Sequence, residues 1–151
     1  MLTARPASSW TNKYDVELDG RPLTIWEASL WKQGGKCTLD GHDYRIRSNT
    51  WGTRHTMVDE SGDEVAVADK VGRKQWTVTY GGQTFHFRRR SLWSQQQDLY
   101  LGEQAVGYAR RPSAWRRDVE LDLPGMPTPA QVFVLAVVIA MWDAQTAAAT
   151  G

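Results

Sequence analysis

Seven arginines in the second half of the chain carry the most specific binding chemistry in the sequence. They fall in three short groups, which are Arg88, Arg89, Arg90, then Arg110, Arg111, and finally Arg116, Arg117. Residues 73–117 hold nine Lys and Arg but only two acidic residues, a net charge of +7, whereas residues 51–72 and 118–151 carry −3 and −4. A guanidinium makes forked, charge-assisted hydrogen bonds to phosphate. The arginines therefore predict a basic patch that suits phosphorylated head groups.

The same arginines also have a purely structural interpretation. They stand at the ends of predicted neighbouring strands, where they can gather on one rim of a barrel. Charged side chains in such positions also discourage edge-to-edge pairing between sheets, without any ligand. The sequence leaves both interpretations open.

Other chemistry-bearing residues give weaker patterns. Asp118, Glu120 and Asp122 alternate on one face of a predicted strand, but no ligand loop with a glycine turn accompanies them, so we expect a solvated face. His42, His55 and His86 stand singly, without metal-ligand spacing. The sequence contains no nucleophile elbow, phosphate-binding loop or paired catalytic signature. We expect no catalytic residues, no metal site and no cofactor.

Tryptophan is unusually frequent, at eight residues. Trp26, Trp31, Trp51 and Trp93 could form a sugar-stacking platform or line a pocket, or they could pack the inner face of a sheet and cover its rim. Residues 47–55 are the best candidate for a functional loop, because Trp51 precedes Gly52 in a predicted turn and is expected to be exposed.

The elements that must position these residues are short strands. From Ser8 to Leu123 alternating apolar and polar residues are broken by turn signals about every ten residues, which is typical of a sandwich or barrel of about eleven strands. Asp19-Gly20 and Asp40-Gly41 are strong signals for two-residue hairpins. Further turns are predicted at Gly62, Gly81-Gly82 and Gly102-Glu103. No helical periodicity of useful length precedes Pro127.

A helix is predicted from about Thr128, its cap, to about Ala147, with Pro129 in the first turn. Its eleven consecutive apolar residues, Val132 to Trp142, span only ~16 Å, against ~30 Å for the hydrocarbon core of a bilayer, so we do not expect a transmembrane span. Because these residues cover every face, the helix must be surrounded. A barrel of eleven or more strands is wide enough to enclose it.

Two stretches resemble a known family. Residues 56–70 match a recurring unit of strand, Asp-x-x-Gly turn (Asp59 to Gly62) and strand, and residues 105–145 match the order of closing strands, Leu-Pro break and apolar helix ending in Asp. On these stretches the chain resembles the tubby C-terminal-like superfamily, and within it the LURP-one-related and phospholipid-scramblase-like proteins. The resemblance implies a closed antiparallel barrel of about twelve strands around a hydrophobic C-terminal helix. The cysteine-rich run of scramblases has no counterpart here, since Cys37 is the single cysteine.

These features predict one mainly β domain spanning residues 1–151. Charge is nearly balanced, with 18 Lys and Arg against 17 Asp and Glu, so nucleic-acid binding is not expected. The first ten residues lack the apolar run of a signal peptide, and we expect a cytoplasmic protein, peripheral at a membrane. The leading function is a non-enzymatic binding or regulatory domain for an anionic lipid head group or another phosphorylated ligand. The alternatives are a protein-interaction scaffold without a small ligand, and a barrel that carries a ligand after its helix leaves.

Overall fold

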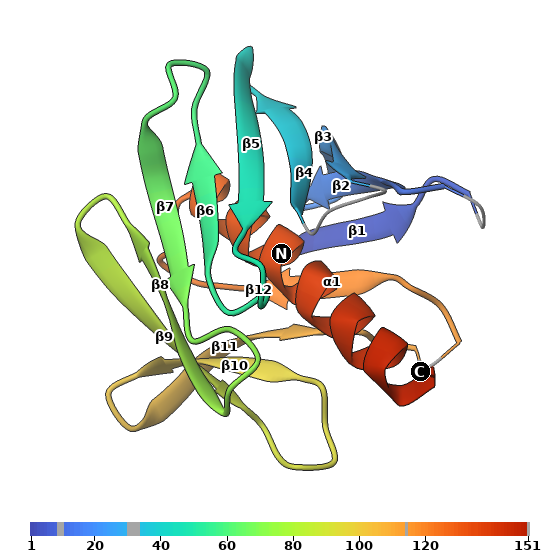
Figure 1. Ribbon diagram of the computed structural model, residues 1–151, viewed down its shortest axis with the longest axis vertical. Coiled ribbons are helices and arrows are strands. Elements are labelled where there is room, and N and C mark those ends of the chain that lie inside the picture. Colours follow the sequence, from blue (N-terminus) through green and yellow to red (C-terminus); the bar gives the residue numbers. More distant parts are fainter. Residues whose placement is uncertain (9–10, 30–33, 114, 151) are drawn as a thin grey trace.

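In the computed structural model the chain folds into twelve strands and one helix (Figure 1). The structure describes residues 1–8, 11–29, 34–113 and 115–150. Residue 150 is described only by its place in the helix. The elements are β1 Leu2–Pro6, β2 Lys13–Leu18, β3 Arg21–Ala28, β4 Gly34–Leu39, β5 His42–Ser48, β6 His55–Val58, β7 Glu64–Asp69, β8 Gln75–Tyr80, β9 Gln83–Arg89, β10 Gln97–Leu101, β11 Gln104–Arg110, β12 Val119–Asp122 and α1 Thr128–Thr150.

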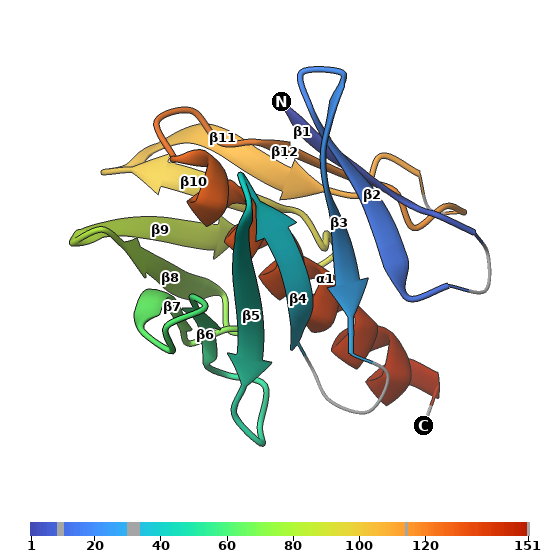
Figure 2. The same cartoon turned by 90° about the horizontal axis from the view of Figure 1, so that it is seen from above.

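The strands form a closed antiparallel barrel in sequence order, as predicted (Figures 1 and 2). The closing strand, β1, differs from the prediction, which placed the first strand after Ser8. β1 pairs with β2 on one side and with β12 on the other, where Leu2 lies opposite Leu121. The segment Leu2–Pro6 is short and has no turn signal before it, but its alternation does place Leu2 and Ala4 in the core.

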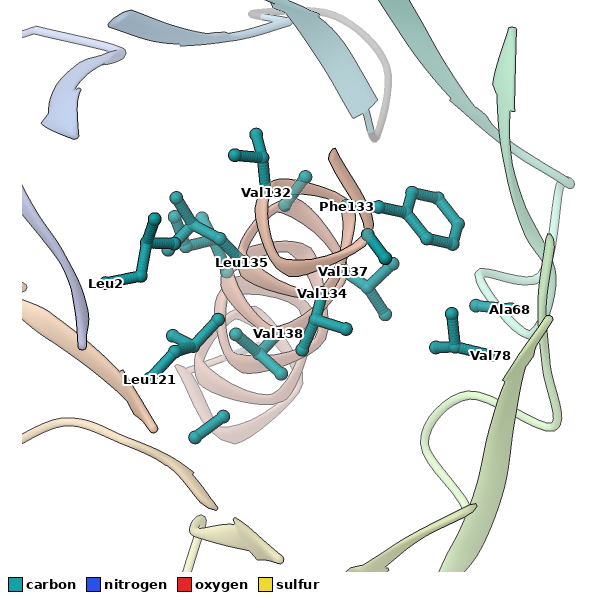
Figure 3. Packing of buried hydrophobic residues seen from close by; sticks show 14 of the residues in the cluster. Leu2, Ala68, Val78, Leu121, Val132, Phe133, Val134, Leu135, Val137 and Val138 are labelled. Atoms are coloured by element: carbon teal, nitrogen blue, oxygen red, sulfur yellow. The ribbon is translucent and has the colours of Figure 1, made fainter. Parts of the chain in front are cut away.

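The helix fills the barrel, which confirms the second part of the prediction. Of the eleven residues from Val132 to Trp142, all but the half-buried Ala140 are buried. In Figure 3, Leu135 faces the side of Leu2 and Leu121, whereas Phe133 points toward Ala68 and Val78. By length and composition Thr128–Ala149 could also cross a membrane, a test that the buried core helix of a soluble protein passes as well. The barrel wall supplies the apolar surroundings that this helix requires.

The connections fall into two sets, because neighbouring strands run in opposite directions. We call the end that carries the described residues 7–8, 11–12, 29, 49–54, 70–74, 90–96, 111–113 and 115–118 the loop end. The opposite end, which we call the hairpin end, carries residues 19–20, 40–41, 59–63, 81–82, 102–103 and the segment 123–127 that leads into α1.

The two ends differ in how they are built. The two-residue turns of the hairpin end include Asp19-Gly20 and Asp40-Gly41, whose positive φ angles are those that such turns require. α1 enters the barrel at the hairpin end and leaves it at the loop end, where its C-terminus lies (Figure 1). The loop end is therefore the one at which longer connections and the end of the helix come together.

Candidate functional site

Charge is divided between the two ends of the barrel. The described residues of the loop-end connections carry eight cations against one carboxylate, a net charge of +7; the cations are Arg54, Lys70, Arg73, Lys74, Arg90, Arg111, Arg116 and Arg117, and the carboxylate is Asp118. The hairpin-end connections, all of which the structure describes, contain six carboxylates and neither Lys nor Arg; they are Asp19, Asp40, Asp59, Glu60, Asp63 and Glu103. An asymmetric charge of this size creates a field along the barrel axis.

Several loop-end cations are occupied by local ion pairs. Arg54 contacts Asp69 at 2.9 Å, and Arg90 contacts the buried Asp98 at 3.1 Å. By contrast, six basic side chains at this end form no ion pair with another described residue; they are Lys70, Arg73, Lys74, Arg89, Arg116 and Arg117. Arg89 and Arg117 are half-buried, and Arg117 interacts electrostatically with Asp143. The cations most available to an anionic partner are therefore the exposed Lys70, Arg73, Lys74 and Arg116.

The structure separates the seven predicted arginines into two groups. Arg88 and Arg110 lie against the outer wall: Arg88 stacks 4.4 Å from the ring centre of Tyr100 and reaches Glu103 at 3.7 Å, and Arg110 pairs with Glu120 at 3.0 Å. The other five, Arg89, Arg90, Arg111, Arg116 and Arg117, stand at the loop end or in its connections. The structure thus brings five of the seven predicted arginines to the loop end and places two against the outer wall.

Where α1 leaves the barrel, two arginines cover aromatic rings. The guanidinium of Arg111 lies 5.0 Å from the ring centre of Trp142 and 3.7 Å from Asp143, and that of Arg117 lies 5.8 Å from the ring centre of Tyr14. Burial is the main cause that raises the pKa of Tyr14 above its ordinary value. Its hydroxyl and the Nε and Nη2 atoms of Arg111 are buried. Arg117 acts on the Tyr14 hydroxyl and lowers its pKa in part, while Arg111 forms its ion pair with Asp143.

The predicted tryptophan platform is not formed as expected. Trp26 is buried in the core, and Trp31 lies outside the described residues. Trp51 and Trp93 are 84% and 96% exposed, as is Trp115 at 95%, and all three stand in loop-end connections. The exposure expected for Trp51 is confirmed.

The structure also places the alternating carboxylates and two of the histidines. Of the alternating carboxylates, Glu120 pairs with Arg110, and Asp118 lies 3.8 Å from Arg5. Among the described residues, no group of three or more His, Cys, Asp or Glu side chains could hold a metal ion. His55 is buried, whereas His42 is exposed and accepts or donates a hydrogen bond of 2.8 Å with Glu60.

Sequence reasoning missed Lys70, Arg73, Lys74 and Trp115 as candidate site residues. The order of the predicted strands contained the information needed to find them, because alternate connections of an antiparallel barrel lie at the same end. Assigning the connections alternately to two ends would have separated the acidic turn at residues 59–63 from the basic one at residues 70–74. Comparison with protein-family models, with curated proteins and with solved structures gave no match.

Proposed function

We propose that the protein is a non-enzymatic binding domain that recognises anionic phospholipid head groups, or another phosphorylated ligand, through the loop end of its barrel. The single observation that carries this proposal is the separation of charge between the two ends. Six loop-end cations that form no ion pair with a described residue lie opposite an acidic end, so that an anionic surface attracts one end and repels the other.

We also propose where in the cell the protein acts and which family it resembles. The cytoplasmic leaflet carries anionic lipids, so a protein of this polarity is expected to bind peripherally on the cytoplasmic side. A twelve-stranded closed barrel around a C-terminal helix supports the resemblance to the tubby C-terminal-like fold, which we keep as part of the proposal.

A protein-interaction scaffold is the second candidate function. The exposed Trp51, Trp93 and Trp115 favour it, because large exposed aromatic side chains are typical of surfaces that bind another protein. A ligand-carrying barrel has less support, since the helix occupies the interior. Releasing it would expose the apolar residues between Val132 and Trp142.

Vesicle binding tests the first candidate against the second. The full-length protein would be mixed with phosphatidylcholine vesicles that contain increasing fractions of phosphatidylserine, at low and at physiological salt. We expect the bound fraction to rise with the anionic content and to fall with salt, because exposed charges are screened over ~10 Å at 0.1 M ionic strength. A protein that binds no vesicle under any of these conditions would overturn the proposal in favour of a protein partner.

A further inference from the structure

We infer that the barrel docks on the bilayer end-on and inserts Trp51, Trp93 and Trp115 into the membrane interface. This inference rests on the proposed function and names one binding partner for the loop end, which is the surface of an anionic bilayer. It starts from the three tryptophans, which are the most exposed large apolar side chains among the described residues. Leaving an indole in water gives up the free energy that its burial would provide, so three such residues at one end indicate a surface that is covered in use.

The tryptophans and cations alternate along one arc of the loop end. The connections 49–54, 70–74, 90–96 and 111–118 follow one another around the barrel, since they join consecutive strand pairs. The first of them presents Trp51, the second presents three cations, and the third presents Trp93 beside the exposed Leu92. The last presents Trp115 next to Arg116. Tryptophan beside Lys and Arg is the combination found where proteins meet the head-group region of a membrane.

Hydrogen bonds hold the tryptophan turns in place. Trp51 is the third residue of a turn in which the Gly52 amide donates to the Asn49 carbonyl at 3.2 Å, and the Asn49 side-chain oxygen accepts from the amides of Thr53 and Arg54. Trp93 occupies the same position in the turn from Ser91 to Ser94.

The third tryptophan is held in a comparable way, because the amide of Trp115 donates to the Ser113 hydroxyl at 3.2 Å. Each of the three exposed indoles therefore stands in a part of a connection that local hydrogen bonds define.

Charge complementarity selects a bilayer and sets the orientation. The described residues of the loop-end connections carry +7 and the hairpin-end connections −6, so a planar anionic surface attracts the first and repels the second along the barrel axis. A single-stranded nucleic acid would instead require a groove in which bases stack on aromatic rings. The indoles here stand in separate connections along an arc of the loop end. In the inferred end-on orientation these connections meet the bilayer together with their cations.

Depth-dependent quenching tests the insertion. The full-length protein and its Trp51→Ala, Trp93→Ala, Trp115→Ala and triple variants would be titrated with phosphatidylcholine–phosphatidylserine vesicles whose acyl chains are either normal or brominated. We expect bromine to quench the wild-type fluorescence, and the triple variant to lose this quenching. Each single change should lower the vesicle partition coefficient about three- to tenfold and the triple change about 100-fold. Leu101→Ala, which removes a 75% exposed side chain at the end of β10 on the hairpin end, should change neither quantity.

The outcomes separate the two proposals. Equal partitioning of the wild type and the triple variant into anionic vesicles, without quenching, would leave electrostatic binding in place and overturn the insertion. If the wild type partitions into no anionic vesicle, the proposed function is wrong and the insertion with it. Tryptophan-dependent binding to a single-stranded oligonucleotide or an acidic polypeptide, in place of vesicles, would also overturn the inference. Because all three side chains are exposed, the variants should keep the unfolding midpoint of the wild type.

Discussion

The indole nitrogen of Trp142 donates a hydrogen bond of 2.9 Å to the carbonyl oxygen of Gln95. This bond joins the point at which α1 leaves the barrel to the β9–β10 connection, which also presents Trp93. Trp142 is fully buried, and the guanidinium of Arg111 lies over its ring. The end of the core helix is thus attached to the loop end, the surface that we propose to bind an anionic partner.

Trp142→Phe should destabilise the protein by about 1–3 kcal/mol, because it removes this hydrogen bond and leaves a small cavity. Urea unfolding of the purified variant measures the loss. The matched control is Trp93→Phe, whose side chain is 96% exposed and whose stability should stay within about 0.5 kcal/mol of the wild type. Equal stability of the two variants would show that the Trp142 contact contributes nothing to folding.

Removing the cations at residues 70–74 should weaken vesicle binding. Each Lys or Arg near an anionic surface contributes about 1 kcal/mol, so the combined Lys70→Gln, Arg73→Gln and Lys74→Gln variant should bind about 100-fold more weakly. The three side chains are exposed and form no ion pair with described residues, so the fold should be unaffected. Arg21→Gln removes an exposed cation beside the hairpin end and serves as the control. Co-sedimentation with vesicles measures both, and a similar loss in the control would contradict a directional surface.

His55 should make the protein less stable in mild acid. Burial lowers the pKa of His55 below its ordinary value, and this effect outweighs the opposing interaction with the backbone of Gly52. The unfolded chain therefore takes up the proton more readily than the folded one. Stability should be complete above pH ~6.5, the pKa of an unfolded histidine, and should fall as pH drops from there toward the folded pKa.

The His55→Leu variant tests this pH dependence, since it replaces the ring with a side chain of similar size that binds no proton. Thermal unfolding of the wild type and the variant would be compared between pH 7.5 and pH 5.5. The midpoint of the wild type should fall more steeply than that of the variant. His86→Gln, on the exposed face of β9, serves as the control for the loss of a histidine. Parallel curves for the wild type and His55→Leu would rule out His55 as the source.

Leu135→Ala should cost about 2–5 kcal/mol, because it opens a cavity between the helix and the strands that hold Leu2 and Leu121 (Figure 3). The loss would appear as a lower denaturant midpoint with an unchanged slope. Ala148→Ser, on the exposed last turns of the same helix, should leave the midpoint where it is. A Leu135→Ala protein as stable as the wild type would contradict the view that the helix is the core of the barrel.

The sequence predicted the strands and the helix better than it predicted which charged side chains come together on the surface. Asp-Gly turns and the uninterrupted apolar run from Val132 to Trp142 are local signals, and both gave the correct elements. β1 was missed because its five residues carry only a short alternation, although the strand closes the barrel between β2 and β12. A strand at a chain end is recognised by its partners, which local sequence does not specify.

The site was only partly predictable, because surface charge depends on the direction of each side chain. Arg88 and Arg89 are neighbours in the sequence, but successive residues of a strand point to opposite faces. Arg88 therefore lies on the outer wall over Tyr100, while Arg89 forms no ion pair with a described residue. Lys70 was left out of the predicted site because its connection joins the loop end only when the barrel closes.

The most direct test of the central claim asks which end of the barrel touches the membrane. Cys37 is buried, and burial raises its pKa to about 12, so this thiol should resist labelling at neutral pH. A new cysteine can therefore be labelled with an environment-sensitive fluorophore at the loop end, through Ser91→Cys, or at the hairpin end, through Ser61→Cys. Both serines are exposed.

Each labelled protein would then be mixed with phosphatidylserine-containing vesicles. We predict a blue-shifted, brighter emission from the label at residue 91 and no change from the label at residue 61. A response from residue 61 alone, or from neither position, would contradict the account.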